Sequence, residues 1–236
     1  MNRFLSLILC LSMFFSLASC KKNTEVVVDY SAQKQAISGT KWYSAMDIPN
    51  GIVIWNFFED SVEKTDYSFD GNWMHKLTTT VADITFQKDV IKVEFEDTTQ
   101  LIPYMFKNNE ILLKEGEFFT PKDIELGIQG CWTVRTSKYD EIFDVNTENE
   151  YNIQFDNGIM RNENAAKAIL GEPGEYYYYG PNEGKYTIGD GSFETDCKDG
   201  DEYFFSVYQG IVRIFHAGNE MKHIEQLPGE MGYVFS

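Results

Sequence analysis

Few residues of this chain belong to the types that carry out catalysis, and they are scattered. The histidines are His75, His216 and His223, and none stands in a zinc-protease, nucleophile-elbow or phosphate-loop pattern. No nucleophile has a general base beside it, as covalent catalysis requires. We therefore expect a protein that is not an enzyme and needs no cofactor.

Metal ligands are equally sparse. Acidic residues gather between Asp190 and Glu202, and oxygen ligands in a flexible loop suit calcium. Their spacing matches no EF-hand, and solvated turns often have this composition. Neither Cys131 nor Cys197 has the nearby Cys or His partner that zinc would need. We expect no metal site, with calcium as the minor alternative.

A run of tyrosines is the most suggestive candidate for ligand binding. On a strand, Tyr177 and Tyr179 would share one face and Tyr176 and Tyr178 the other, so one pair would meet solvent or a cavity. Flat, partly polar rings suit stacking on a sugar or contact with an apolar ligand. Tyrosine is also common in half-buried strands without any ligand, and the residues alone favour this simpler interpretation somewhat.

The N-terminus has the layout of a secretory signal, with a charged start, a short apolar run and small residues at its end. Its last residues, Leu17-Ala18-Ser19-Cys20, resemble the lipobox of bacterial lipoproteins. The resemblance implies removal of residues 1–19 and attachment of acyl chains such as palmitate to Cys20. It also implies a lipid anchor in a Gram-negative cell envelope. Lys21 after the Cys favours the outer membrane, and we expect the periplasmic face rather than the cell surface.

The remaining cysteines and the charge limit the partners. Cys131 and Cys197 would lie in an oxidising compartment, where they can form a disulfide or stay separate, and the sequence decides neither. The chain has 20 basic and 37 acidic residues, a net charge of −17, so nucleic acid is not an expected partner. The oligomeric state is not indicated.

Behind a polar tether at 20–36, short runs rich in β-branched and aromatic residues predict strands. In Val90-Ile91-Lys92-Val93-Glu94-Phe95-Glu96, apolar and charged residues alternate, as in a strand with one wet face. Expected strands in the first half are 40–45, 51–58, 64–69, 73–80, 82–87, 90–96, 101–106 and 110–114. Glu163 to Leu170, between Asn162 and Gly171, predicts a short helix.

Similar landmarks recur along the chain and suggest a duplicated module. Gly39-Thr40-Lys41-Trp42 is echoed by Gly130-Cys131-Trp132, and Phe69-Asp70-Gly71 by Phe155-Asp156-Asn157-Gly158. A closing hairpin at 104–114 is matched by one at 205–215. We expect an all-β fold of two small antiparallel barrels or sandwiches in tandem, at 37–122 and 123–236, with one short helix in the second.

Gly130-Cys131-Trp132 resembles the G-x-W signature of lipocalins, and Gly39 to Trp42 is a looser version. The resemblance implies structural roles for Trp42 and Trp132, each at one end of a barrel, although each copy is shorter than a full lipocalin. We expect a non-catalytic binding module for a small apolar or saccharide ligand. The alternative is an envelope scaffold that docks another protein through an exposed edge or face.

Overall fold

The computed structural model describes residues 28–71, 73–140, 145–169, 175–197 and 203–229. The expected signal, Cys20 and most of the tether lie outside these residues. Contacts divide the chain into two units, Met1–Tyr30 and Ser31–Ser236. The larger unit is, in its described part, predominantly antiparallel β structure, which confirms the expected fold class.

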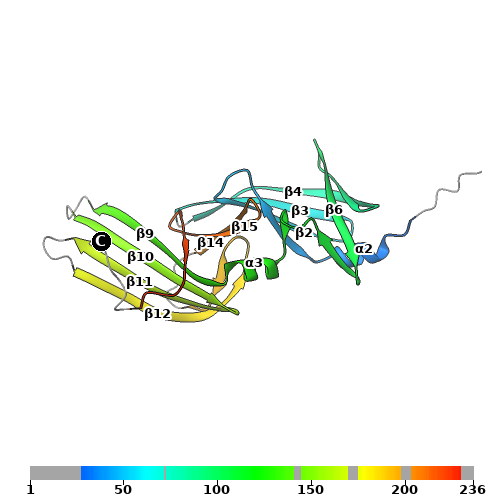
Figure 1. Ribbon diagram of the computed structural model, residues 1–236. Helices are drawn as coiled ribbons and strands as arrows, with labels where there is room; N and C mark the ends of the chain where they lie inside the picture. The colour runs from blue at the N-terminus through cyan, green and yellow to red at the C-terminus, as the bar shows by residue number, and fades with distance from the viewer. Residues whose placement is uncertain (1–27, 72, 141–144, 170–174, 198–202, 230–236) are drawn as a thin grey trace, which may run out of the picture. The chain divides into compact units, whose positions relative to one another are not determined.

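The first half of the larger unit forms a strongly curved sheet (Figure 1). In the described part of the chain it has eight strands, ordered β7-β6-β5-β4-β3-β2-β1-β8. Its strands are β1 (Lys41–Ala45), β2 (Gly51–Phe57), β3 (Ser61–Asp70), β4 (Trp73–Gln87), β5 (Val90–Glu94), β6 (Thr99–Lys107), β7 (Glu110–Leu113) and β8 (Phe118–Phe119). Helix α2 (Ser31–Ile37) precedes β1. The expected strands are confirmed, except that 73–80 and 82–87 are one continuous strand.

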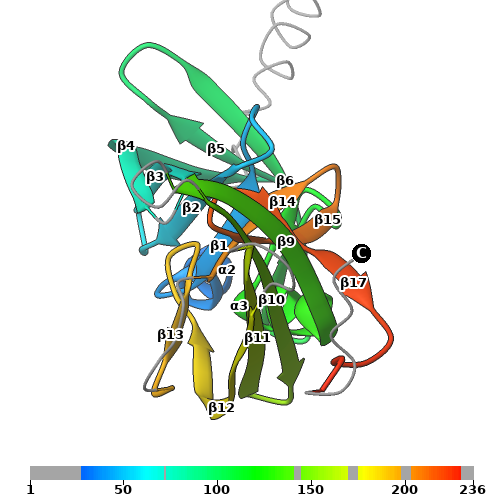
Figure 2. The ribbon, with the colours of Figure 1, turned by 90° about the vertical axis from the view of Figure 1, so that its left-hand side faces the viewer.

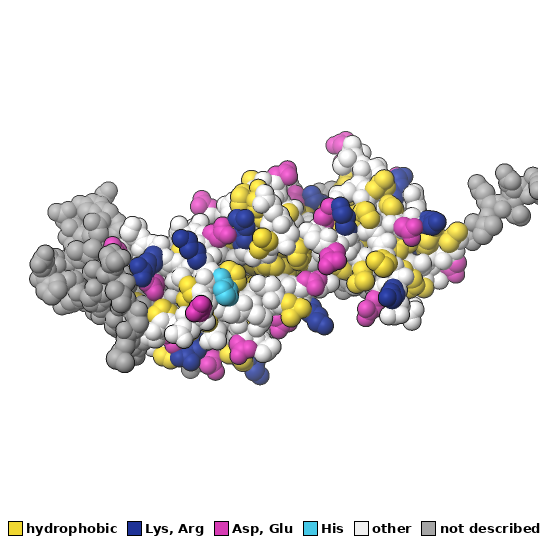
Figure 3. Space-filling view, in the orientation of Figure 1, with side chains coloured by type: hydrophobic (Ala, Val, Ile, Leu, Met, Phe, Trp, Pro, Cys, Tyr) yellow, Lys and Arg dark blue, Asp and Glu magenta, His cyan; other side chains and the backbone are white. Residues whose placement is uncertain are grey.

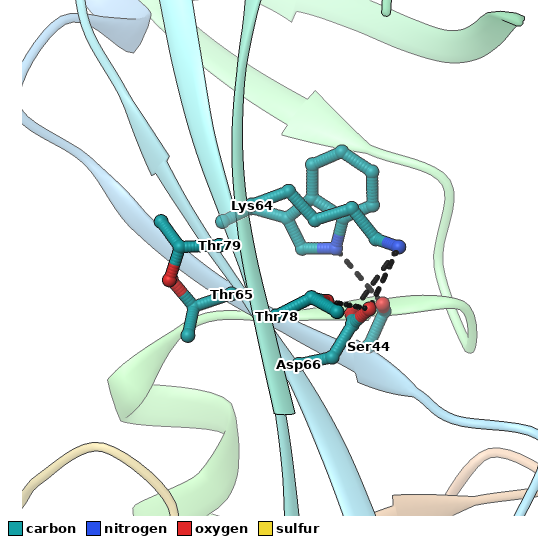
Figure 4. A network of polar contacts seen from close by, with 7 residues as sticks. Ser44, Lys64, Thr65, Asp66, Thr78 and Thr79 are labelled. Atoms are coloured by element: carbon teal, nitrogen blue, oxygen red, sulfur yellow. Dashed lines mark hydrogen bonds and ion pairs between the residues drawn. The ribbon is translucent and has the colours of Figure 1, made fainter. Parts of the chain in front are cut away.

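Side chains fill the inner face of the curved sheet. Trp55 is buried and packs edge-on against Phe118, with ring centroids 5.8 Å apart. Its indole Nε1 donates to Ser44 Oγ at 2.9 Å, and Lys64 lies over its ring. Figure 4 shows this cluster continuing through Asp66, which accepts from Thr78 Oγ1 at 2.8 Å. The charged groups therefore satisfy one another beside the apolar interior.

The second half forms a flatter sheet and a separate small one. The former, within the described residues, is ordered β13-β12-β11-β10-β9-β17, and Figure 2 shows β17 beside β9. Its strands are β9 (Gly130–Asp140), β10 (Val145–Asp156), β11 (Ile159–Ile169), β12 (Glu175–Ile188), β13 (Phe193–Thr195) and β17 (Lys222–Ile224). The small sheet contains β14 (Tyr203–Tyr208), β15 (Ile211–His216) and β16 (Asn219–Glu220).

The expected helix at 163–170 is wrong, because residues 163–169 belong to β11; residue 170 lies outside the described structure. Glu150 of β10 pairs with Ala165, which pairs with Tyr178 of β12 on its other side. Ala and Lys favour helices, but hydrogen bonding along both edges outweighs that weak local preference. A short helix occurs instead at α3 (Pro121–Ile128), which begins at the N-cap Thr120.

One core crosses the expected domain boundary at 122/123, which falls in the first turn of α3. It joins Tyr43 and Ile54 of the first sheet to Ile153, Phe155 and many other residues of the second half. Tyr43 Oη donates to Gly189 O at 2.8 Å, and Ser206 Oγ donates to Pro49 O at 2.7 Å. The two halves therefore share a core, whereas tandem domains would each have their own.

The landmarks that recur in the two halves agree in structure at one position and differ at another. Gly39 and Gly130, ahead of the two tryptophans, both have positive φ, at 78° and 112°. However, Phe69-Asp70-Gly71 ends the third strand of its half, whereas Phe155 to Gly158 ends the second strand of its own. These two turns are therefore not equivalent, and equal residue types at similar spacing did not reflect equal topology.

Candidate functional site

A large hollow lies where the first sheet fails to close. Its terminal strands β7 and β8 follow one another in the chain through the turn at 114–117, yet no hydrogen-bonded pairing joins them in the described structure. Between them opens a groove of about 870 Å³, which we call the seam. This volume falls in the range of small-molecule pockets, about 300–1,000 Å³.

The seam has an apolar floor. Four buried side chains form it, contributed by both ends of the sheet: Trp42, Ile111, Leu113 and Phe118. Ile111 and Leu113 alternate with exposed residues along β7, so both point to the inner face of the curved sheet. Figure 3 shows hydrophobic side chains gathered near the end of this half that carries α2 and β6. The surface suits an apolar ligand better than a charged one.

The walls of the seam are held in place by local hydrogen bonds. Trp42 Nε1 donates to Thr40 Oγ1 at 3.0 Å, and that hydroxyl donates to Ile37 O at 2.6 Å. On the opposite wall, Thr120 and Asp123 form a capping box that fixes the start of α3. The indole is therefore held in one orientation, which lowers the entropic cost of any contact that it makes with a ligand.

Trp132, the second expected structural tryptophan, lies outside the seam. It packs against the shared core, and its Nε1 donates to Ile128 O at 2.7 Å. His223 meets it edge-on at 5.2 Å. Gly130 has a φ of 112°, which favours glycine, and a Cβ there would lie 2.6 Å from His223 Nε2, so His223 would have to shift.

The tyrosine run lies on β12, as expected of a strand. Tyr178 pairs with Ala165 and Tyr179 with Asn164 across to β11. The side chains of Tyr176, Tyr177, Tyr178 and Tyr179 lie outside the described structure, so their proposed ligand contacts stay a prediction.

The two remaining cysteines are both buried, free thiols, so the disulfide is not formed in the structure. Cys131 pairs with Gln154, next to Ile153, whose side chain enters the shared core, so Cys131 points to the other face of the sheet. Cys197 belongs to that core. The intervening sheet keeps them apart, and burial raises the pKa of the Cys131 thiol.

Two of the acidic residues considered for calcium make other contacts in the structure. Asp190 pairs with Lys41 at 2.5 Å, and Asp196 accepts from the Lys185 backbone N–H at 2.5 Å. Residues 198–202 lie outside the described structure. Elsewhere in the described residues, no group of three or more His, Cys, Asp or Glu side chains is arranged to hold a metal ion.

Comparison with known proteins adds no relative to these observations. No protein-family model matches the chain, and no curated protein does so either. Among the helices that the structure describes, none has the length and apolar character needed to cross a membrane.

The seam was not foreseen from the sequence. Trp42 was singled out, but as a structural residue, and Ile111 and Leu113 are ordinary strand residues in the sequence. The signal that existed was the shortness of the apolar run at 118–119, which cannot form a full ladder with the strand before it.

Proposed function

We propose that this chain is a non-catalytic binding protein of the cell envelope that holds a small apolar ligand in the seam. One observation carries the proposal: an apolar groove of about 870 Å³ floored by Trp42 and Phe118, where a curved sheet stops short of closing. The filled inner face of the sheet supports the seam as the site, because buried side chains such as Trp55 and Phe57 occupy the barrel interior.

Binding of the neutral fluorescent probe N-phenyl-1-naphthylamine tests the seam. Leu112 lines the groove and is 48% exposed, so Leu112→Lys should fold normally while placing a charge at the edge of the groove. We expect saturable fluorescence enhancement with the natural sequence and at least tenfold weaker binding with Leu112→Lys. The matched control is Leu101→Lys, at a site that is 60% exposed and does not line the groove. Equal affinity in both variants, or no saturable binding, would contradict the proposal.

The membrane anchor is part of the same proposal and rests on the sequence of residues 17–20. Several acyl chains on Cys20 would hold the chain at the outer membrane, on the periplasmic side. We expect Cys20→Ser to abolish incorporation of an alkyne-tagged palmitate in a Gram-negative host. Cys10→Ser, in the segment that would be removed, should label normally. Continued labelling of Cys20→Ser would exclude this residue as the lipid site.

A docking role is the second candidate, favoured by an open edge on β4. Residues 73–82 of β4 pair with β3 along one edge. On the other edge, β4 pairs with β5 only from Asp83 onward, so residues 73–82 have no strand beside them there in the described structure. His75 to Val81 are all exposed, so an extended segment of another protein has room to add a strand there. This role predicts hydrogen-exchange protection of residues 75–81 in the intact envelope, which a ligand in the seam would not produce.

A further inference from the structure

A second hollow, of about 700 Å³, has the opposite character to the seam. It lies over β9 and β10, and its lining includes Thr133, Arg135, Glu150, Asn152, Lys222 and Gln226. We call it the polar pocket. It uses the face of the sheet that is turned away from the shared core, because Tyr151, Ile153 and Phe155 alternate with Glu150 and Asn152 along β10.

The C-terminal segment encloses this face. Strand β17 pairs with β9 from Lys222 to Ile224. Beyond it, the Gly229 backbone N–H donates to Glu163 Oε2 at 3.1 Å, so the chain passes over the sheet. Gln226 and Pro228 of this segment line the pocket. Enclosure explains why Glu150 is only 4% exposed and Asn152 is fully buried.

The floor of the pocket holds an amide in one orientation. Arg135 Nε donates to Glu150 Oε2 at 2.6 Å, and Asn152 Nδ2 donates to Glu150 Oε1 at 3.2 Å. Because a carboxylate accepts only from the NH₂ end of the amide, Asn152 Oδ1 must be the other end. No described residue donates a hydrogen bond to this oxygen. A buried acceptor without a donor is uncommon in native proteins. This oxygen has less than 1 Å² of accessible surface, so a ligand that supplies the donor must displace part of the floor as it binds.

The charges around the pocket specify the kind of donor. Arg135 pairs with Glu150, and Glu220 pairs with Arg213, so both carboxylates of the lining already have a cation. The formal charges of the lining itself, Arg135 and Lys222 against Glu150 and Glu220, sum to zero. A charged ligand would leave one of these groups opposed, whereas hydroxyl groups can donate to Asn152 Oδ1 and accept from the rim cations. We propose that the polar pocket binds a neutral polyhydroxylated ligand of the size of a mono- or disaccharide. This site is independent of the seam.

Calorimetric titration with glucose, galactose, N-acetylglucosamine and their disaccharides tests the polar pocket. Asn152→Leu keeps the approximate side-chain volume and removes the unpaired acceptor. We expect saturable binding of at least one of these sugars by the natural sequence and at least tenfold weaker binding by Asn152→Leu. The matched control is Asn56→Leu on β2, whose side chain also donates to a strand carboxylate, Glu63, at 3.5 Å.

A second variant protects the test against misfolding of the first. Gln226→Ala alters the exposed rim of the pocket without touching its floor, and it should weaken sugar binding at least threefold. Bound sugar should also slow hydrogen exchange at residues 133–135, 150–152 and 224–228. Absence of binding across the panel, or unchanged affinity in both variants, would overturn the proposal. Retained binding of N-phenyl-1-naphthylamine in Asn152→Leu would show that the seam stands separately.

Discussion

Phe205→Ala should lower the free energy of unfolding by about 3–5 kcal/mol, the usual range for deleting a buried aromatic ring. Phe205 has no exposed surface. Its ring centroid lies 5.4 Å from that of Tyr43 on β1 and 5.4 Å from that of Phe193 on β13. A cavity at this position would therefore remove contacts from both halves at once.

Urea unfolding followed by tryptophan fluorescence and by circular dichroism measures this effect. The two probes should report one transition at the same midpoint, because the shared core couples the sheet around Trp55 to the β9–β12 sheet. Phe58→Ala is the control, since Phe58 is 50% exposed and should cost less than about 1 kcal/mol. Two separate transitions, of which Phe205→Ala shifts only the one that reports the second half of the chain, would show that the halves are independent domains.

Stability should fall steeply above pH 10, mainly because of Tyr43. Burial raises the pKa of this phenol well above its ordinary value of 10, and the carboxylates of Asp190 and Glu194 add to the effect. In the unfolded chain Tyr43 ionises near pH 10, while in the folded protein it stays protonated. The unfolded state is therefore favoured as the pH rises, by about 1.4 kcal/mol for each pH unit between the two pKa values.

Unfolding free energies measured from pH 9 to 12 test this prediction. Tyr43→Phe should reduce the loss of stability per pH unit in this range. Part of the loss should remain, because burial also raises the pKa of Tyr67 and Tyr186. The variant loses the hydrogen bond to Gly189 O, but that carbonyl still accepts from the Gly191 N–H at 3.1 Å. The same slope in both proteins would mean that Tyr43 is not the main alkaline group.

Much of the β structure could be predicted from alternation and turn residues. The hairpin turns at Asp89 and at Asn108-Asn109 take positive φ, as their residue types suggested. The helix predicted at 163–170 failed because local composition says nothing about neighbours on both sides of a strand. The shared core could not be predicted for a similar reason. Tyr43 and Phe205 are far apart in the sequence, and each would fit the core of a separate barrel equally well.

The two proposed binding sites depend on features that the sequence displays weakly or not at all. The seam exists because β7 and β8 are not paired, and the short apolar run at 118–119 is a weak sequence signal for that missing ladder. The polar pocket depends on Asn152 lying under a segment from much later in the chain, near Gln226. Asparagine in a strand is ordinary until its carbonyl is seen to lack a donor.

For the ligand proposed in the seam, the missing ladder between β7 and β8 would also set the rate of entry. Strand β7 is held by β6 along one edge only, so its four residues, Glu110–Leu113, can fray without breaking the rest of the sheet. The rate of ligand entry would then equal the opening rate of the short β6–β7 hairpin, while the rest of the curved sheet stays intact around the ligand.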